Sequence, residues 1–240
     1  MEKNKIVAIV LAAGTGSRMK SAQKKQFMDL CGYPLIYYAL QVFEHSSQVD
    51  EVIIVTGRED ISYCHKEIVE RYGFHKVKSI VAGGEERYLS VYEGLKAVTN
   101  AKYVLIHDGA RPFIQQKHID EIVQSLEHGD ACILGMPVKD TIKKADVNQY
   151  VQETPDRKDL WTIQTPQAFP YQVIKEAYKR AIQEKIEAIT DDAMVLEKTF
   201  QIPVKILKGG YYNIKVTTPE DLQIAEVFVK SLIGKNIKKI

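Results

Sequence analysis

Cysteine is scarce in this chain of 240 residues, and no two cysteines form a CxxC pair. The three that are present, Cys31, Cys64 and Cys132, are an odd number and lie far apart in the sequence. This pattern favours neither a disulfide framework nor a thiolate metal site. It is typical of a protein of the reducing cytoplasm.

Long hydrophobic runs are absent as well. Near the N-terminus, the run from Ile6 to Ala13 has eight apolar residues, which is too few to cross a membrane. The charged residues before it do not have the layout of a secretory signal peptide. We therefore expect no membrane partner.

The chain also lacks an excess of charge of one sign. Its 33 Lys and Arg nearly balance its 31 Asp and Glu, for a net charge of +2, so the overall charge indicates no nucleic-acid partner. Apolar residues make up 45% and charged residues 27%, which excludes a disordered, collagen-like or coiled-coil chain. A site for an anionic ligand must therefore gather its basic residues locally.

Short apolar runs recur along the chain and predict strands that are buried on both faces of a parallel sheet. After the run at 6–13 they lie at 52–55, 79–84, 103–109 and 131–138. Segments with helical periodicity lie between them, as at 119–126, and helices are also expected at 34–43, at 173–182 and after Thr218-Pro219. This alternation predicts an α/β protein with a three-layer, Rossmann-like fold and a mostly parallel, twisted sheet.

One segment interrupts the alternation. Residues 139–169 are polar and include Trp161, the only tryptophan of the chain. A loop of that length inside a compact domain is usually functional. We expect a single domain over residues 1–240 from which 139–169 projects as a β-arm, with Trp161 as a packing anchor.

The first strand runs into the glycine turn GTGSRMKSAQKKQ, residues 14–26. Glycines at this place let backbone N–H groups approach phosphate oxygens. Met19 stands where both the dinucleotide motif GxGxxG and the P-loop GxxxxGK[ST] need glycine, so neither class fits. A charge run is usually a solvated face, but cations at the end of a first strand lie where a polyphosphate binds. The cations here are Arg18, Lys20, Lys24 and Lys25.

The motif HDGARP, residues 107–112, ends the fourth apolar run. Asp108 is a candidate ligand of Mg²⁺, or equally a carboxylate that accepts backbone hydrogen bonds in the turn. Arg111 could bind a second anionic substrate. His107 is expected to be structural, because a phosphate attacks without deprotonation at neutral pH. Lys215, expected in a strand before the last helix, is by itself a weak candidate.

Motifs from Ile6 to about Leu232 resemble the 2-C-methyl-D-erythritol 4-phosphate cytidylyltransferases of the non-mevalonate isoprenoid pathway, a family of the nucleotidyltransferase superfamily. The motifs are LAAGTGSRM with KQF, AGGEERYLSV, HDGARPF, PVKDTIK, DRKDLW with TPQAF, TDDA and NIKVTTPEDL, in that order. The resemblance implies a cytidylyltransferase that joins CTP to 2-C-methyl-D-erythritol 4-phosphate, giving 4-diphosphocytidyl-2-C-methyl-D-erythritol and pyrophosphate. It also implies Mg²⁺ or another divalent cation as cofactor, and a homodimer linked through the arm.

The resemblance also implies a role for each matching residue. CTP would be bound by Ala12, Ala13, Gly14, Gly16, Gly84, Glu85, Ser90 and Asp108, and Asp108 would hold the metal. The catalytic cations would be Arg18 and Lys25 on the triphosphate and Lys215 on the α-phosphate. The sugar phosphate would meet Arg111, Thr141, Thr165 and Thr190, with Arg157 reaching the sugar phosphate of the neighbouring subunit.

Two residues depart from the family pattern, and two other functions stay open. Lys24 stands where the family usually has proline, so either Lys24 or Lys25 could face the triphosphate. Glu85 replaces a more usual aspartate at the base contact. The alternatives are a ribitol-5-phosphate cytidylyltransferase and a non-catalytic nucleotide-binding module that regulates a partner.

Overall fold

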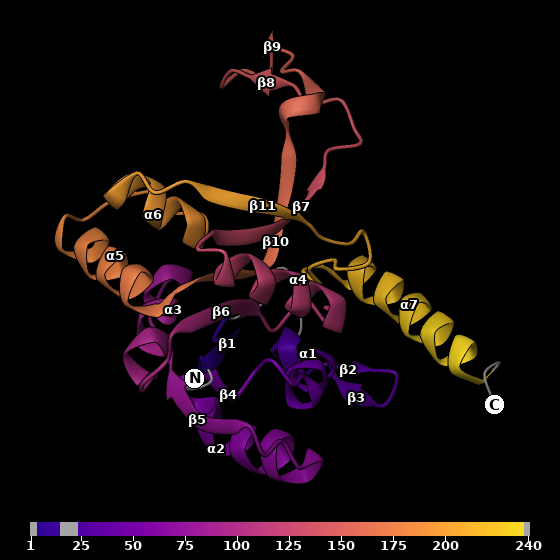
Figure 1. Ribbon diagram of the computed structural model, residues 1–240. Helices are drawn as coiled ribbons and strands as arrows, with labels where there is room; N and C mark the ends of the chain where they lie inside the picture. Colours follow the sequence, from indigo (N-terminus) through magenta and orange to yellow (C-terminus); the bar gives the residue numbers. More distant parts are fainter. Residues whose placement is uncertain (1–3, 15–23, 238–240) are drawn as a thin grey trace.

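The computed structural model describes residues 4–14 and 24–237, and its centre is a sheet of seven strands in the order β11-β7-β10-β6-β1-β4-β5 (Figure 1). The strands are β1 (Ile6–Ala12), β4 (Glu51–Thr56), β5 (Val77–Ala82), β6 (Tyr103–Asp108), β7 (Ala131–Pro137), β10 (Trp161–Pro170) and β11 (Val204–Lys208). Strand β10 runs antiparallel to β6 and β7, and every other pair is parallel. The expected mostly parallel sheet is therefore confirmed.

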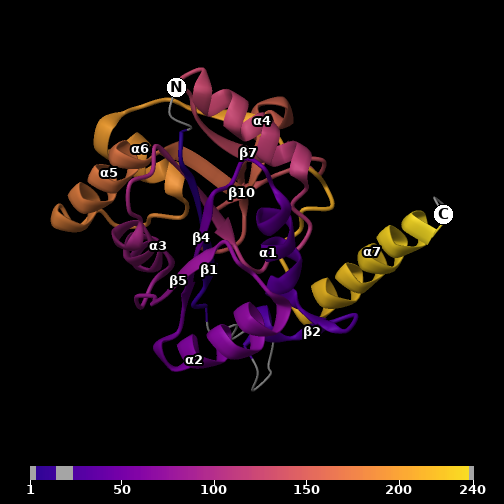
Figure 2. The same ribbon diagram turned by 60° about the horizontal axis from the view of Figure 1, so that its bottom comes forward.

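Helices cover both faces of the sheet, as Figure 2 shows. One face packs on α1 (Leu35–His45), α4 (Gln116–Glu127) and the π-helix Cys64–Glu70, and the other on α3 (Arg87–Ala97), α5 (Tyr171–Gln183) and α6 (Asp192–Phe200). Along β1, Ala8 and Val10 face the first group while Val7 and Ile9 face the second. Burial of such a side chain contributes roughly 1.5–3 kcal/mol, so the continuous apolar runs hold three layers together.

Shorter elements complete the chain. They are η2 (Lys25–Phe27), β2 (Asp29–Leu30), β3 (Tyr33–Pro34), η3 (Arg58–Asp60), α2 (Ile61–Tyr63), β8 (Lys144–Ala145), β9 (Val151–Glu153) and η5 (Arg157–Asp159). The last described element is a helix of 19 residues, α7 (Pro219–Ile237). Helix α7 begins as predicted, because the Asp221 N–H donates to the Thr218 hydroxyl over 3.3 Å. No helix in the described part of the chain is both long enough and apolar enough to cross a membrane.

Two local predictions were wrong. Strand β5 was expected to be buried on both faces, but it is the edge strand and its residues are only partly buried. Lys215 was expected in a strand, but residues 213–217 form no strand. A backbone hydrogen bond from the Val216 N–H to the Ala110 carbonyl attaches this segment to the turn after β6.

Residues 138–160 stand away from the sheet in Figure 1, with β8 and β9 at the tip. At the base of this projecting segment, β10 pairs with β7, which places Trp161 opposite Pro137. Trp161 is 37% exposed, so its own chain covers the expected packing anchor only in part. Val147 and Tyr150 at the tip are 97% and 73% exposed.

Candidate active site

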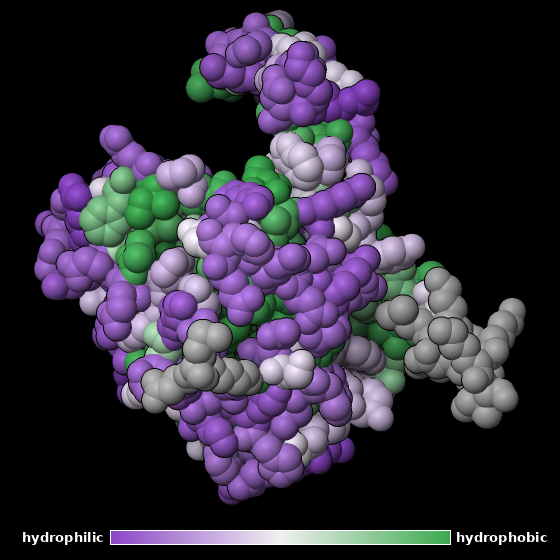
Figure 3. Space-filling view, in the orientation of Figure 1, coloured by the Kyte–Doolittle hydropathy of each residue, from purple (hydrophilic) through white to green (hydrophobic). Residues whose placement is uncertain are grey.

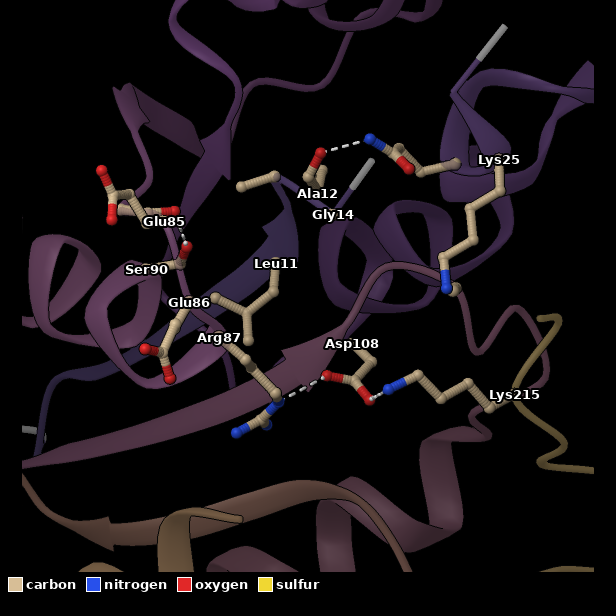
Figure 4. A pocket seen from close by; sticks show the side chains of 14 residues that line it. Leu11, Ala12, Gly14, Lys25, Glu85, Glu86, Arg87, Ser90, Asp108 and Lys215 are labelled. Carbon is tan, nitrogen blue, oxygen red and sulfur yellow. Dashed lines mark hydrogen bonds and ion pairs between the residues drawn. The ribbon is translucent and has the colours of Figure 1, made fainter. Parts of the chain in front are cut away.

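A cavity of about 260 Å³ lies at the carboxyl ends of β1 and β6. Nine of the residues singled out from the sequence line it, namely Ala12, Ala13, Gly14, Lys25, Gly84, Glu85, Ser90, Asp108 and Lys215. Figure 4 shows Glu85 and Ser90 on one side and Lys25 on the other. Two further predicted residues, Gly16 and Arg18, lie outside the described residues.

Glycine lets the loop after β5 close on the first strand. A Cβ atom at Gly83 would lie 2.6 Å from the Ala13 Cβ and 2.6 Å from the Ser90 Oγ, and one at Gly84 would lie 2.5 Å from the Leu89 Cβ. These distances are below van der Waals contact, so side chains there would push the loop off the cavity. The Ser90 hydroxyl donates to the Gly84 carbonyl over 3.2 Å and keeps the loop in place.

The two neighbouring lysines point to different places. The Lys24 amino group lies 2.5 Å from Asp60 and also pairs with Glu59, outside the cavity. Lys25 begins the short helix η2 and lines the cavity. In the same helix, the Gln26 amide donates to the Ala12 carbonyl and joins η2 to the end of β1. Of the two lysines, Lys25 therefore lines the cavity and Lys24 does not.

Asp108 ends β6 and is surrounded by three cations. Its carboxylate oxygens lie 2.8 Å from the Lys215 Nζ, 3.2 Å from the Arg87 Nε and 3.9 Å from the Arg111 Nε. Burial by itself would raise the pKa of Asp108, but the charges of Arg87, Lys215 and Arg111 hold that pKa well below its ordinary value. The carboxylate is therefore ionised at any physiological pH.

Arg87 and Asp192 were missed in the sequence. The Arg87 guanidinium binds the fully buried Asp192 carboxylate through both terminal nitrogens, at 2.8 and 2.9 Å, and the Tyr178 hydroxyl donates to the same carboxylate over 2.5 Å. Burial would lower the pKa of Arg87, but Asp192 and then Asp108 raise it well above the ordinary value. Both residues stand inside quoted motifs, AGGEERYLSV and TDDA, but only folding brings them together.

His107 is buried and structural, as expected. Its Nδ1 lies 3.1 Å from the Thr165 hydroxyl and its Nε2 lies 3.0 Å from the Arg111 carbonyl. The Arg111 carbonyl can only accept, so the proton of the neutral ring sits on Nε2 and the Thr165 hydroxyl donates to Nδ1, while its oxygen accepts from the Asp108 N–H. Burial lowers the pKa of His107 to about 4, so the ring is neutral at pH 7.

Two of the residues expected at the sugar phosphate lie just outside the cavity lining. The Arg111 guanidinium donates to the carbonyls of Asn213 and Ile163, at 2.8 and 3.3 Å. Thr165 is 3% exposed and bonds to Asp108 and His107. In this structure both side chains fix the surroundings of Asp108.

The other three residues are not brought to this cavity by their own chain. Thr141 and Arg157 are exposed on the projecting segment, where an Arg157 terminal nitrogen donates to the Lys139 carbonyl over 2.8 Å. Thr190 is exposed ahead of α6. A site that used Thr141 and Arg157 would need a second subunit.

The donor set around Asp108 fits a metal ion that arrives with its ligand. The described residues include no group of three or more His, Cys, Asp or Glu side chains that could hold a metal. Mg²⁺ is commonly bound by one or two carboxylates together with substrate phosphates and water. One ionised carboxylate on a cavity flanked by lysines suits that mode.

A family model described as 2-C-methyl-D-erythritol 4-phosphate cytidylyltransferase matches residues 6–231. The chain belongs to this family. A family member from Lachnospira eligens is 50% identical over 224 residues, which cover 93% of this chain and 98% of that protein. Another from Lachnoclostridium phytofermentans is 47% identical, over 94% of this chain and 97% of that protein.

Solved structures of the family have the same fold. The crystal structure of 4-diphosphocytidyl-2C-methyl-D-erythritol synthase from Anaerococcus prevotii is 33% identical and superposes with a TM-score of 0.84, covering 95% of this chain and 97% of that one. The Thermus thermophilus cytidylyltransferase is 26% identical with a TM-score of 0.75, covering 92% and 98% of the two chains. The cavity described above is therefore the candidate active site of a family member.

We predict that two neighbouring aspartates differ in their effect on stability. Asp192→Ala removes the fully buried partner of Arg87, leaves it only Asp108, and should lower the free energy of unfolding by about 3 kcal/mol. Asp191→Ala removes the N-cap of α6, whose carboxylate accepts from the Met194 N–H, and should cost about 1 kcal/mol. Urea denaturation at pH 7 measures both, and equal losses would contradict the special position of Asp192.

Proposed function

We propose that this member of the family joins CTP and 2-C-methyl-D-erythritol 4-phosphate, giving 4-diphosphocytidyl-2-C-methyl-D-erythritol and pyrophosphate. The observation that supports this most directly is the cavity itself. It combines Gly14 at the end of β1 with Lys25, Lys215 and the ionised Asp108, in a chain that is 50% identical to a curated cytidylyltransferase.

The reaction is an in-line attack of the sugar phosphate on the α-phosphorus of CTP, so two anions must meet. Lys25 and Lys215 would reduce the repulsion between them and stabilise the negative charge that builds up at the α-phosphorus. Asp108 would hold Mg²⁺ or another divalent cation, which when bound neutralises charge on the triphosphate. No general base is required, which agrees with a neutral, buried His107.

We assign the remaining CTP-binding residues from their positions on the cavity. Ala12, Ala13 and Gly14 present backbone at the end of β1, where phosphate oxygens would lie, and Gly84, Glu85 and Ser90 form the opposite wall, where the base would lie. Gly16 and Arg18 continue the same turn in the sequence. Glu85 is exposed at the rim, so its longer side chain has room to adjust.

We also propose that the projecting segment pairs two subunits. Val147, Tyr150 and Val151 are exposed on it, between 60% and 97%, and Figure 3 shows hydrophobic side chains among hydrophilic ones there. Such side chains gain from burial against a second copy. Arg157 and Thr141 would then reach the sugar phosphate bound next to Arg111, Thr165 and Thr190 of the neighbouring subunit.

We also propose that the chain is a single domain and lies in the cytoplasm. We take residues 1–240 as one nucleotidyltransferase domain with 139–169 as its arm, because both main core clusters share the same central sheet. We propose the cytoplasm as its location, which agrees with three cysteines that are free thiols in the structure.

Pyrophosphate release tests which sugar phosphate is the substrate. With CTP present, pyrophosphate release should occur with 2-C-methyl-D-erythritol 4-phosphate and not with ribitol 5-phosphate, each offered separately. Release with ribitol 5-phosphate alone would make the chain a ribitol-5-phosphate cytidylyltransferase. CTP binding without release under either condition would support the non-catalytic module.

Substitution of the neighbouring lysines should have different effects on kcat. Lys25→Ala should lower kcat by about 100-fold or more, because it removes a cation from the transition state, and should change the KM for the sugar phosphate far less. Lys215→Ala should have the same effects on kcat and on this KM. Lys24→Ala is the matched control, since that side chain pairs with Glu59 and Asp60, and it should keep kcat within about threefold. Equal losses in kcat and in sugar-phosphate binding for Lys25→Ala would contradict its catalytic role.

Mixed variants test whether two subunits share each active site. Arg157→Ala should raise the KM for the sugar phosphate. When Arg157→Ala and Lys25→Ala subunits are mixed and allowed to exchange, heterodimers should contain one complete site. About a quarter of the wild-type activity should then return if the two chains pair at random. A mixture of Lys25→Ala with the double variant Lys25→Ala, Arg157→Ala contains no complete site and is the control. No recovery in the first mixture would refute the shared site.

A further inference from the structure

A second cavity, of about 510 Å³, lies between the start of α4 and the segment that follows β11. It shares no described lining residue with the cavity at Asp108. Its lining includes Lys117 and His118 from α4, Lys139 from the base of the arm, Lys208 from the end of β11, and Tyr211 and Asn213 from the segment after it.

Two buried side chains at this cavity have polar atoms without a hydrogen-bond partner. Neither ring nitrogen of His118 has a hydrogen-bond partner, and neither has the Asn213 Oδ1, although the two residues are 2% and 0% exposed. Buried polar groups are rarely left in this state, because each costs about 1–3 kcal/mol. Burial and then Lys117 lower the pKa of His118 to about 4, so the neutral ring offers one donor and one acceptor.

The walls of the cavity are cationic and aromatic. Lys117, Lys139 and Lys208 line it, and its described lining contains no carboxylate. The Lys139 ammonium lies 3.3 Å from the centre of the Tyr211 ring. Helix α4 has 12 residues and begins here, and Gln115 at its N-cap makes no side-chain capping bond. A helix N-terminus of this kind attracts anions.

We propose that this cavity is a binding site for a small organic phosphate with an apolar or aromatic body. The lysines and the start of α4 bind the phosphate group. His118 and Asn213 form hydrogen bonds with polar atoms of the ligand. Its apolar part packs against the tyrosines and against Phe113 and Phe228, which also line the cavity.

The position of the site connects it to the CTP cavity, a consequence that rests on the proposed function. Asn213 donates to the Thr165 carbonyl over 2.9 Å and accepts from Arg111, and both of those residues support Asp108. Lys215 follows in the same segment and lines the CTP cavity. A ligand on Asn213 therefore changes the affinity for CTP, and by linkage CTP changes the affinity for that ligand by the same factor.

Isothermal titration with phenyl phosphate tests the site. Inorganic phosphate has only the phosphate group and phenol only the aromatic ring, so each should bind at least about tenfold more weakly than phenyl phosphate. Lys208→Gln should weaken phenyl phosphate binding about tenfold, the effect of one charge-assisted contact. Lys205→Gln is the matched control on the same strand, because its amino group pairs with Asp130 over 2.7 Å outside the cavity, and it should leave binding unchanged.

Two further measurements locate the ligand. The ring ¹⁵N signals of His118 should shift on addition of phenyl phosphate, and binding should persist, with altered affinity, under saturating CTP. Absence of binding would overturn the proposal, as would binding that CTP abolishes and that Lys208→Gln leaves unchanged. If CTP itself does not bind, the proposed function fails, while the comparison of Lys208→Gln with Lys205→Gln still decides the site.

Discussion

The buried carboxylate of Asp108 is the interaction on which the rest of the active site depends. It is 7% exposed and stays ionised because Arg87, Lys215 and Arg111 surround it. A buried charge without partners would cost several kcal/mol, and so would three cations crowded together without an anion. The carboxylate thus gathers positive charge at the cavity while keeping the fold stable.

Each of the three cations is held from a different part of the chain. Asp192 of α6 holds Arg87, the carbonyls of Ile163 and Asn213 hold Arg111, and the bond from Val216 to Ala110 places the segment of Lys215. Strand β10, helices α3 and α6 and the segment before α7 therefore converge on the end of β6. The near-neutral net charge of +2 hides this concentration of cations.

The fold could be read from the sequence wherever burial was uniform. Continuous apolar runs predicted β1, β4, β6 and β7, since both faces of those strands are covered. The same pattern wrongly predicted burial on both faces for β5, which lies at the edge of the sheet. Within the site, Asp108 and Lys215 could be found by motif, but the pairing of Arg87 with Asp192 could not, because 105 residues separate them.

The sequence by itself determined five strands of the central sheet, four of the helices, the family, and most of the residues on the cavity, because periodicity and motifs are local. Only the tertiary structure decided which of two adjacent lysines faces the cavity. Lys24 turns away because Glu59 and Asp60, from a distant turn, attract its charge. The tertiary structure also placed Asn213 and His118 on a second cavity, since burial and unmet hydrogen bonds depend on what the whole chain packs around a side chain.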